Sequence, residues 1–388
     1  MTVTDLTVLQ YFACTSDGSG GTMNYTVNFG QRPFNYTAPS GFKALCTQNL
    51  STPSIVKSNT AFDALVWSGD GVNNRKLTTN FSPDLFWVKA RNSAAYHSIN
   101  DSVRGANAIL QTNTTSAEQV NSNGYVTTFA ADGVNITNGS DINASGTNYV
   151  GWAWDAGTTT VTNTAGTISA QVRANPTTGF SIVSYTGVVG GNSVGHGLGV
   201  APKFIIVKGR TTSAWIVYTQ MTGVNAYLYL HTSGASVSDA GIWSGTGSGV
   251  TSSTFGVRGA SDNGLTGVNL IAYCFAEVPG FSAFGSYTGN GSTDGPFVYT
   301  GFRPAWIMIK RSDNTENWNL YDTKRNSYNV ADSELYPNLS NSEGTYADRD
   351  FLSNGFKIRN TNIGRNASGS TYIYAAFAEN PFKYSLAR

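Results

Sequence analysis

The sequence is poor in charged residues. Only 12% of its 388 residues are Asp, Glu, Lys or Arg, whereas a soluble domain usually has about 25%. Coiled coils, helix bundles and long amphipathic helices need Lys, Glu, Arg and Ala in quantity, so the composition argues against them. The 24 basic and 23 acidic residues give a net charge of +1, and no stretch gathers the basic ones. We therefore expect no nucleic-acid partner, because such a partner requires a phosphate-neutralising stripe.

Cysteine and histidine are scarce as well. The three cysteines are Cys14, Cys46 and Cys274, and the three histidines are His97, His196 and His231. Three cysteines cannot all pair within one chain, and neither residue type shows the spacing of a metal site, so we expect the cysteines to fill apolar space. The sequence also has no Gly-x-Ser-x-Gly nucleophile elbow. These absences predict a protein without metal, cofactor or enzymatic activity.

Long hydrophobic runs are missing too. No stretch of about 18 apolar residues occurs, and residues 1–13 lack the basic start and apolar core of a secretion signal. We expect no membrane insertion and synthesis in a cytoplasm. Apolar residues nevertheless make up 40% of the chain and aromatic residues 12%, which is enough to fill several cores.

The sequence contains an internal repeat, which is the first feature to seek in a chain of this length. An aromatic-x-Gly signal at Trp67, Tyr185 and Tyr287 precedes each copy of a second signal. That second signal is a proline opening an apolar run that ends in lysine six residues later: Pro83 to Lys89, Pro202 to Lys208 and Pro304 to Lys310. A further apolar block returns 71, 73 and 73 residues after these prolines, at Trp154, Phe275 and Phe377. The constant separations predict three homologous units.

Two of the three units share an Asp-x-x-Arg pair. Asp101 and Arg104 in the first unit match Asp322 and Arg325 in the third, with each aspartate twelve residues beyond the unit's lysine. The middle unit has no such pair. We interpret the pair as a local ion pair or turn clamp, with ligand binding as the alternative. A glycosidase would need two carboxylates across a cleft, but recurrence in two units favours a structural role for these aspartates.

The repeated apolar runs predict strands. A four-residue apolar run opened by proline and closed by a charge has the length and composition of a strand that is apolar on both faces. One face must fill the core of its own unit. The other face needs a cover, which could be a helix, a neighbouring unit or another subunit. Units of about 100 residues made of short strands and turns predict an all-β protein of three tandem antiparallel β-sandwich repeats, jelly-roll or concanavalin-like, plus a short N-terminal β segment.

The repeat also sets the expected domain boundaries. We place an N-terminal segment at 1–56, the first sandwich at 57–157, a linker or added hairpin at 158–176, the second sandwich at 177–279 and the third at 280–388. Because almost no spacer separates the second and third units, we expect them to be stiffly stacked. Most tryptophans fall in the repeated frame and are expected in the core. Trp243 lies apart in a Gly/Ser-rich stretch, where an aromatic ring could either pack or stack on a sugar.

The repeated pattern resembles a known group of sequences. It runs aromatic-x-Gly, Pro-x5-Lys-x-Arg or variants, Trp-x-x-Tyr-Asp-(Ser/Thr)-x-Arg, Asn-Gly-Phe, Asn-x-Ser-Gly-x-x-Tyr and Ala-Phe-Ala-Glu-x-Pro over residues 60–385. As a set it is similar to β-sandwich repeats in structural and tail-fibre proteins of tailed bacteriophages. Residues 28–45 separately resemble the closing strand region of SPRY domains, a concanavalin-like sandwich. The resemblance implies a virion component with lectin-like folds.

These observations together lead to an expected function. We expect a non-enzymatic bacteriophage virion protein, a tail-fibre or appendage component acting in assembly and multivalent host attachment. The alternatives are a carbohydrate-binding receptor-recognition module and a capsid decoration or collar protein. The expected partners are copies of the chain itself, with a trimer as one form, other virion proteins and a host surface glycan. The homo-oligomer is expected because doubly apolar strands need a cover.

Overall fold

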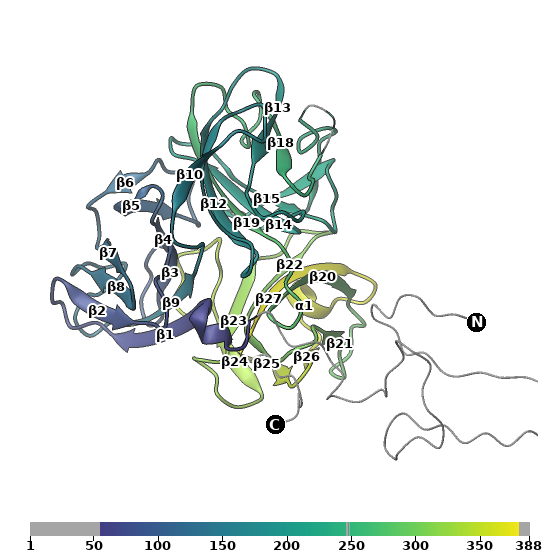
Figure 1. Ribbon diagram of the computed structural model, residues 1–388. Helices are drawn as coiled ribbons and strands as arrows, with labels where there is room; N and C mark the ends of the chain where they lie inside the picture. The colour runs from purple at the N-terminus through teal and green to yellow at the C-terminus, as the bar shows by residue number, and fades with distance from the viewer. Residues whose placement is uncertain (1–54, 246, 248, 380–388) are drawn as a thin grey trace, which may run out of the picture. The chain divides into compact units, whose positions relative to one another are not determined.

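The computed structural model describes residues 55–379 apart from residues 246 and 248 (Figure 1). The chain divides into two compact units, residues 1–51 and 52–388, and every described residue belongs to the second. The SPRY-like segment, Cys14 and Cys46 lie outside the described residues, apart from residues 55 and 56 at the segment's end. The described part is almost entirely β, with one 3-10 turn, η2 (Ser58–Thr60), and one short helix, α1 (Ile363–Asn366). None of its helices has the length and apolar character needed to cross a membrane.

The first β-sandwich pairs a six-stranded sheet with a three-stranded sheet, both antiparallel. The larger sheet has the order β1-β9-β3-β4-β5-β6 and the smaller one the order β2-β8-β7. Their strands are β1 (Phe62–Ser68), β2 (Arg75–Thr78), β3 (Leu85–Ala90), β4 (Ser98–Asp101), β5 (Gly105–Gln111), β6 (Gln119–Val120), β7 (Val126–Ala130), β8 (Gly133–Ile136) and β9 (Asn148–Trp154).

The second sandwich has an eight-stranded and a two-stranded sheet. The sheet orders are β10-β11-β12-β19-β14-β15-β16-β17 and β13-β18. The strands are β10 (Thr160–Asn163), β11 (Ala170–Asn175), β12 (Phe180–Thr186), β13 (Gly191–Gly195), β14 (Phe204–Gly209), β15 (Trp215–Thr219), β16 (Ala226–Tyr229), β17 (Val237–Ser238), β18 (Thr254–Arg258) and β19 (Asn269–Phe275).

The third sandwich consists of two four-stranded sheets. Their orders are β20-β27-β22-β23 and β21-β26-β25-β24. The strands are β20 (Ser282–Thr288), β21 (Phe297–Tyr299), β22 (Pro304–Arg311), β23 (Asn319–Asp322), β24 (Ala331–Glu334), β25 (Gly344–Leu352), β26 (Gly355–Ile358) and β27 (Thr371–Ala378). In Figure 1 the three sandwiches appear in purple to blue, teal, and green to yellow.

The same strand order occurs in all three sandwiches. The orders β1-β9-β3-β4, β12-β19-β14-β15 and β20-β27-β22-β23 correspond strand by strand. The register corresponds as well, since Trp87 pairs with Trp152, Ile206 with Tyr273 and Met308 with Ala375. Of the three strands at the centre of this order, β22 begins at its repeated proline, and β3 and β14 begin two residues after theirs. The described part of the chain is therefore almost entirely β and built of antiparallel sandwiches, as the sequence predicts.

Each proline-opened strand divides its apolar side chains between two cores. Phe86 and Val88 of β3 point into the first sandwich, whereas Leu85 and Trp87 point into a core shared by all three sandwiches. The strands β14 and β22 alternate in the same way. The alternation follows from the two-residue period of a strand. Of the three covers that the sequence allows for the outer face, the structure shows the neighbouring units.

The shared core closes the three sandwiches into a ring. Trp154, Phe275 and Phe377 occupy equivalent positions near the ends of β9, β19 and β27, with ring centroids 5.7 to 6.3 Å apart. The aromatic and aliphatic side chains of the shared core line a cavity of about 20 Å³, and a cavity lined in this way stays dry. The three sandwiches thus surround a common core and do not form an extended row.

Residues 158–176, expected as a linker or an added hairpin, contain the β10–β11 hairpin. Strand β11 pairs with β12 at the edge of the second sandwich, and Arg173 on β11 reaches the first sandwich. Its Nε lies 2.6 Å from Asp84 Oδ1 and donates to Gly157 O at 3.0 Å. The hairpin therefore extends one sheet and contacts the preceding sandwich.

Candidate functional site

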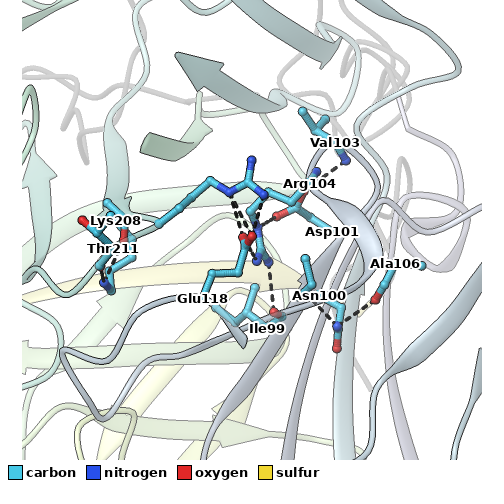
Figure 2. Close-up of polar contacts among 12 residues, drawn as sticks. Ile99, Asn100, Asp101, Val103, Arg104, Ala106, Glu118, Lys208 and Thr211 are labelled. Atoms are coloured by element: carbon cyan, nitrogen blue, oxygen red, sulfur yellow. Dashed lines mark hydrogen bonds and ion pairs between the residues drawn. The ribbon is translucent and has the colours of Figure 1, made fainter. Parts of the chain in front are cut away.

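The Asp-x-x-Arg pair of the first sandwich begins at the last residue of β4 and lies at a contact between sandwiches, which we call a seam (Figure 2). Asp101 Oδ1 accepts hydrogen bonds from the backbone N–H groups of Val103 and Arg104, at 3.0 and 2.8 Å. The Arg104 guanidinium bonds to Asp101 Oδ2, and it also donates to Ile99 O and Glu118 Oε2, both at 3.0 Å. The aspartate thus closes the turn after β4 and orients the arginine.

The second sandwich completes this network. Arg210, two residues beyond Lys208, donates from Nε to Glu118 Oε2 at 2.9 Å, and Tyr273 OH donates to Asp101 Oδ2 at 2.7 Å. The side chains of Asp101 and Arg104 are fully buried. Burial opposes the charge on Arg104, but the neighbouring acidic groups, led by Asp101, outweigh burial and hold the pKa of the guanidinium above its ordinary value.

The seam between the third and first sandwiches repeats the arrangement. Arg325 Nε bonds to Asp322 Oδ2 at 2.6 Å, and its Nη1 bonds to Glu343 at 2.8 Å. The first sandwich supplies Arg91, which bonds to Glu343 Oε1 at 2.7 Å, and Trp152, whose indole N–H donates to Asp322 Oδ2 at 3.1 Å. Each of these two seams therefore joins two carboxylates and two guanidinium groups in one hydrogen-bonded set. The Asp–Arg pair of each set is fully buried, whereas the second arginine is partly exposed, Arg210 to 31% and Arg91 to 26%.

The seam between the second and third sandwiches keeps the backbone contacts and lacks the charges. Ser236 N donates to Ser312 O at 2.8 Å, as Glu118 N does to Arg210 O and Glu343 N to Arg91 O in the other seams. Small residues replace the charged and aromatic members of the other two seams. Thr219 takes the place of the aspartate, Ser236 that of the glutamate, Ser312 that of the second arginine, and Ala375 that of the ring of Tyr273 or Trp152. The seam between the second and third sandwiches therefore lacks the aspartate, the glutamate, the second arginine and the aromatic ring together.

The three repeated lysines are buried at the ends of β3, β14 and β22. Lys89 Nζ donates to Ala90 O at 2.7 Å, Lys208 Nζ donates to Gly209 O at 2.8 Å, and Lys310 Nζ bonds to Arg311 O. Their relative exposure is zero. Desolvation is the largest influence on each and lowers the pKa of each to about 8. The lysines satisfy loop carbonyls, and Figure 2 shows Lys208 beside Thr211.

The remaining residues singled out from the sequence are distributed through the frame. Pro83, Pro202 and Pro304 are all buried at or before the start of a central strand. Trp243 is fully buried and donates from Nε1 to Ala226 O at 3.0 Å. No ring face of Trp243 is free for a sugar, so the suggested glycan contact gives way to a packing role. Cys274 is a buried free cysteine in the core of the second sandwich.

Sequence reasoning missed a buried charge cluster in the third sandwich. Arg349 Nε bonds to Asp348 Oδ1 at 2.7 Å, and Arg365 Nε lies 2.7 Å from Asp348 Oδ2. Arg365 also bonds to Glu334 and to the hydroxyl of Tyr321. The four charged groups cancel, and they link β23, β24, β25 and α1. No sequence signal reveals the cluster, because its members belong to four different elements and do not recur in the other units.

The described residues offer little reactive chemistry. No group of three His, Cys, Asp or Glu within them could hold a metal ion. The histidines make separate contacts; His97 Nδ1, for example, accepts from Trp87 Nε1 at 3.1 Å. A cavity of about 200 Å³ lies between the first and third sandwiches, with Asn59, Asp63, Thr323 and Lys324 among its lining residues. The repeated Asp–Arg pairs and lysines bond to one another, to neighbouring side chains and to backbone carbonyls.

The fold and the seams define a class of protein: one chain in which three antiparallel β-sandwiches close around a common apolar core, with ionic networks at two of the three seams. The chain belongs to the family described as a domain of unknown function, DUF7483, which matches residues 57–381. This single match spans all three sandwiches. Searches of curated proteins and of solved structures gave no match.

Proposed function

We propose that the chain is a non-enzymatic structural protein of a tailed-bacteriophage virion, a component of a tail fibre or another appendage that acts in assembly and multivalent host attachment. The observation that carries the proposal is the use of the repeated polar residues. The Asp–Arg pairs at the centre of the two seam networks are fully buried and bonded internally, so the frame provides rigidity and leaves surface contacts to the loops and outer sheet faces. The resemblance of the repeated motifs to phage proteins supports the virion setting.

The ring favours a compact module over a shaft. Three sandwiches in a row would supply length, whereas three sandwiches around one core supply a rigid body with loops on several sides. We therefore propose a knob or end piece of an appendage. The same compactness also favours the second candidate, a capsid decoration or collar protein, and the position of the protein on the particle distinguishes the two.

A homo-oligomer remains part of the proposal, but the packing of the doubly apolar strands no longer supports it. The outer faces of the doubly apolar strands are covered within the chain by the other sandwiches, so these strands do not require a second copy. Self-association then rests on the resemblance to phage fibre proteins. Light scattering at several protein concentrations measures it directly, and a dilution-resistant monomer would contradict it.

Immunogold electron microscopy tests the proposed location. Antibodies raised against the purified chain are applied to intact particles of the phage that encodes it, with antibody pre-absorbed on the pure protein as the control. We expect gold at the tail or its appendages. Label on the head or the head–tail junction would support the decoration or collar alternative. Unlabelled particles from a lysate that contains the protein would contradict a virion role.

A further inference from the structure

The strand β21 exposes two aromatic side chains on the outer face of the third sandwich. Phe297 is 46% exposed and Tyr299 is 49% exposed, while Val298 between them is 5% exposed and points into the sandwich. The two rings therefore lie on the same face of one strand, two residues apart. Moving an aromatic ring from water into a protein core normally lowers the free energy, so the exposure of these two rings calls for an explanation.

The other two sandwiches show that the fold does not require aromatic residues here. Leu77 of β2 and Val194 of β13 take the inward position of Val298, as their burial and pairing show. In the first sandwich the neighbours of Leu77 on the outer face are Lys76 and Thr78, and both are exposed. In the second sandwich Ser193 and Gly195 stand at these positions, and both are buried there. Exposed polar residues thus serve these strand positions in the first sandwich, which shows that the fold does not need aromatic side chains here.

Phe297 and Tyr299 form an exposed aromatic patch, which we call the platform. Gly355 on β26 pairs with Tyr299, and a Cβ at Gly355 would lie 3.1 Å from Phe297 Cε2. The edge of the Phe297 ring therefore lies close to the bare glycine backbone, and 46% of the residue remains exposed. The charged groups beside the rings are paired, Lys357 Nζ with Asp294 at 2.7 Å and Arg359 Nε with Asp350 at 3.4 Å. The platform is thus apolar, with a polar border of zero net charge.

We propose that Phe297 and Tyr299 form a binding platform for a neutral pyranose oligosaccharide, a site that deepens and rests on the attachment role proposed above. The apolar face of a sugar ring can stack on each aromatic ring, while the paired charges along the border offer donors and acceptors to its hydroxyl groups. Two half-exposed aromatic rings offer roughly 200 Å², well below the roughly 800 Å² per partner of a stable protein interface. Weak stacking suits a multivalent particle, in which many copies act together.

The test measures glycan binding by the full chain displayed at high density on beads. Wild type and the double variant Phe297→Lys/Tyr299→Thr are applied to an array of neutral and acidic oligosaccharides and to gels containing dextran or, as the acidic probe, alginate. The double variant takes the residues that the first sandwich carries at these positions, so its thermal unfolding should match the wild type. Tyr328→Ser removes an exposed aromatic from outside the platform and is the matched control.

We expect wild type and Tyr328→Ser to bind at least one neutral oligosaccharide and the double variant to bind it at least tenfold more weakly. Equal binding by the double variant, binding to acidic glycans alone, or no binding to any probe would overturn the platform. This outcome is distinct from failure of the proposed function. A protein present on the particle without glycan binding would contradict only the platform, whereas glycan binding by a protein missing from the particle would contradict only the virion role.

Discussion

At the scale of single residues, a buried ionic network stabilises a seam only as a complete set. Removing a charge from water costs several kcal/mol, and paired charges compensate for that cost only when every group has a partner. In the uncharged seam, Thr219 replaces the aspartate and Ala375 the hydrogen-bonding ring. No buried charge is left without a partner there. The joint absence of all members is therefore compatible with a stable seam, whereas the loss of one member is not.

Asp101→Ala tests this cooperation. The substitution leaves Arg104 buried without its closest carboxylate, so we expect it to lower the free energy of unfolding by about 3–5 kcal/mol. Thr219→Ala, at the equivalent position of the second sandwich, should cost about 1 kcal/mol. Urea unfolding of both variants and the wild type gives the comparison. Equal losses in the two variants would show that the network adds nothing specific to its seam.

Glu343 should make the stability of the seam between the third and first sandwiches depend on pH. Burial raises its pKa, but its bonds to Arg91 and Arg325 outweigh burial and hold the pKa below the ordinary 4.5. As pH falls, the unfolded carboxyl takes up its proton first, so the stabilisation is complete above about pH 4.5 and disappears as pH falls through the lower folded-state pKa. We expect Glu343→Gln to be less stable at pH 7 by about 1–3 kcal/mol. Urea unfolding at pH 7, 5, 4 and 3 should show this difference shrinking below pH 4.5, and a constant difference would contradict the assignment.

At the scale of elements, the sequence predicts the strands well but does not predict what packs against their outer faces. The run from Leu85 to Val88 shows that both faces of β3 are dry, because no polar residue interrupts it. It does not show what covers the outer face, since a helix, a neighbour or a subunit all exclude water equally. The partners of Asp101 illustrate the same limit. Glu118 lies 14 residues from its partner Arg104 along the chain, whereas Tyr273 lies 172 residues from its partner Asp101. The contact between Tyr273 and Asp101 therefore depends on the closure of the ring of sandwiches, which no local pattern encodes.

The aromatic platform marks a second limit of sequence reasoning. The segment from Phe297 to Tyr299 reads as an ordinary short strand with alternating burial. Only the strand pairing shows that Phe297 and Tyr299 occupy the positions that Lys76 and Thr78 hold in the first sandwich. In contrast, Trp243 stood out in the sequence because polar residues surround it, although its ring is buried. Local composition therefore did not predict which aromatic ring reaches solvent.

Strand β9 contains a position where only glycine fits its neighbours. A Cβ on Gly151 would lie 2.6 Å from Phe86 Cζ and 3.1 Å from Trp67 Cη2, although the equivalent positions carry Ala272 and Tyr374. The rings of the first sandwich must shift to admit even a methyl group, so we expect Gly151→Ala to cost about 1–3 kcal/mol. Gly234→Ala is the control, because the nearest atom to its added Cβ is 3.5 Å away. Chemical denaturation measures both variants, and equal stability of Gly151→Ala and wild type would contradict the packing argument.

At the scale of the whole molecule, the ring makes the three sandwiches depend on one another. Each contributes large aromatic side chains to the shared core, among them Trp154, Phe275 and Trp306. A sandwich separated from the others would expose its share of this core as an apolar patch of the kind that monomeric proteins avoid. Three equivalent units thus surround one core, as the subunits of a closed cyclic trimer do, but here all three belong to one polypeptide.

This dependence predicts a single unfolding transition for the described part of the chain. Ile307→Ala opens a cavity in the third sandwich's own core, where Ile307 is fully buried, and should cost about 2–5 kcal/mol. Six of the eight tryptophans lie in the first and second sandwiches: Trp67, Trp87, Trp152, Trp154, Trp215 and Trp243. If the ring is cooperative, thermal unfolding followed by tryptophan fluorescence shifts as a whole to lower temperature. If the sandwiches were independent, the signal of these six tryptophans would keep the wild-type midpoint and the transition would split. Because the shared core joins aromatic side chains of all three sandwiches, we expect the uniform shift.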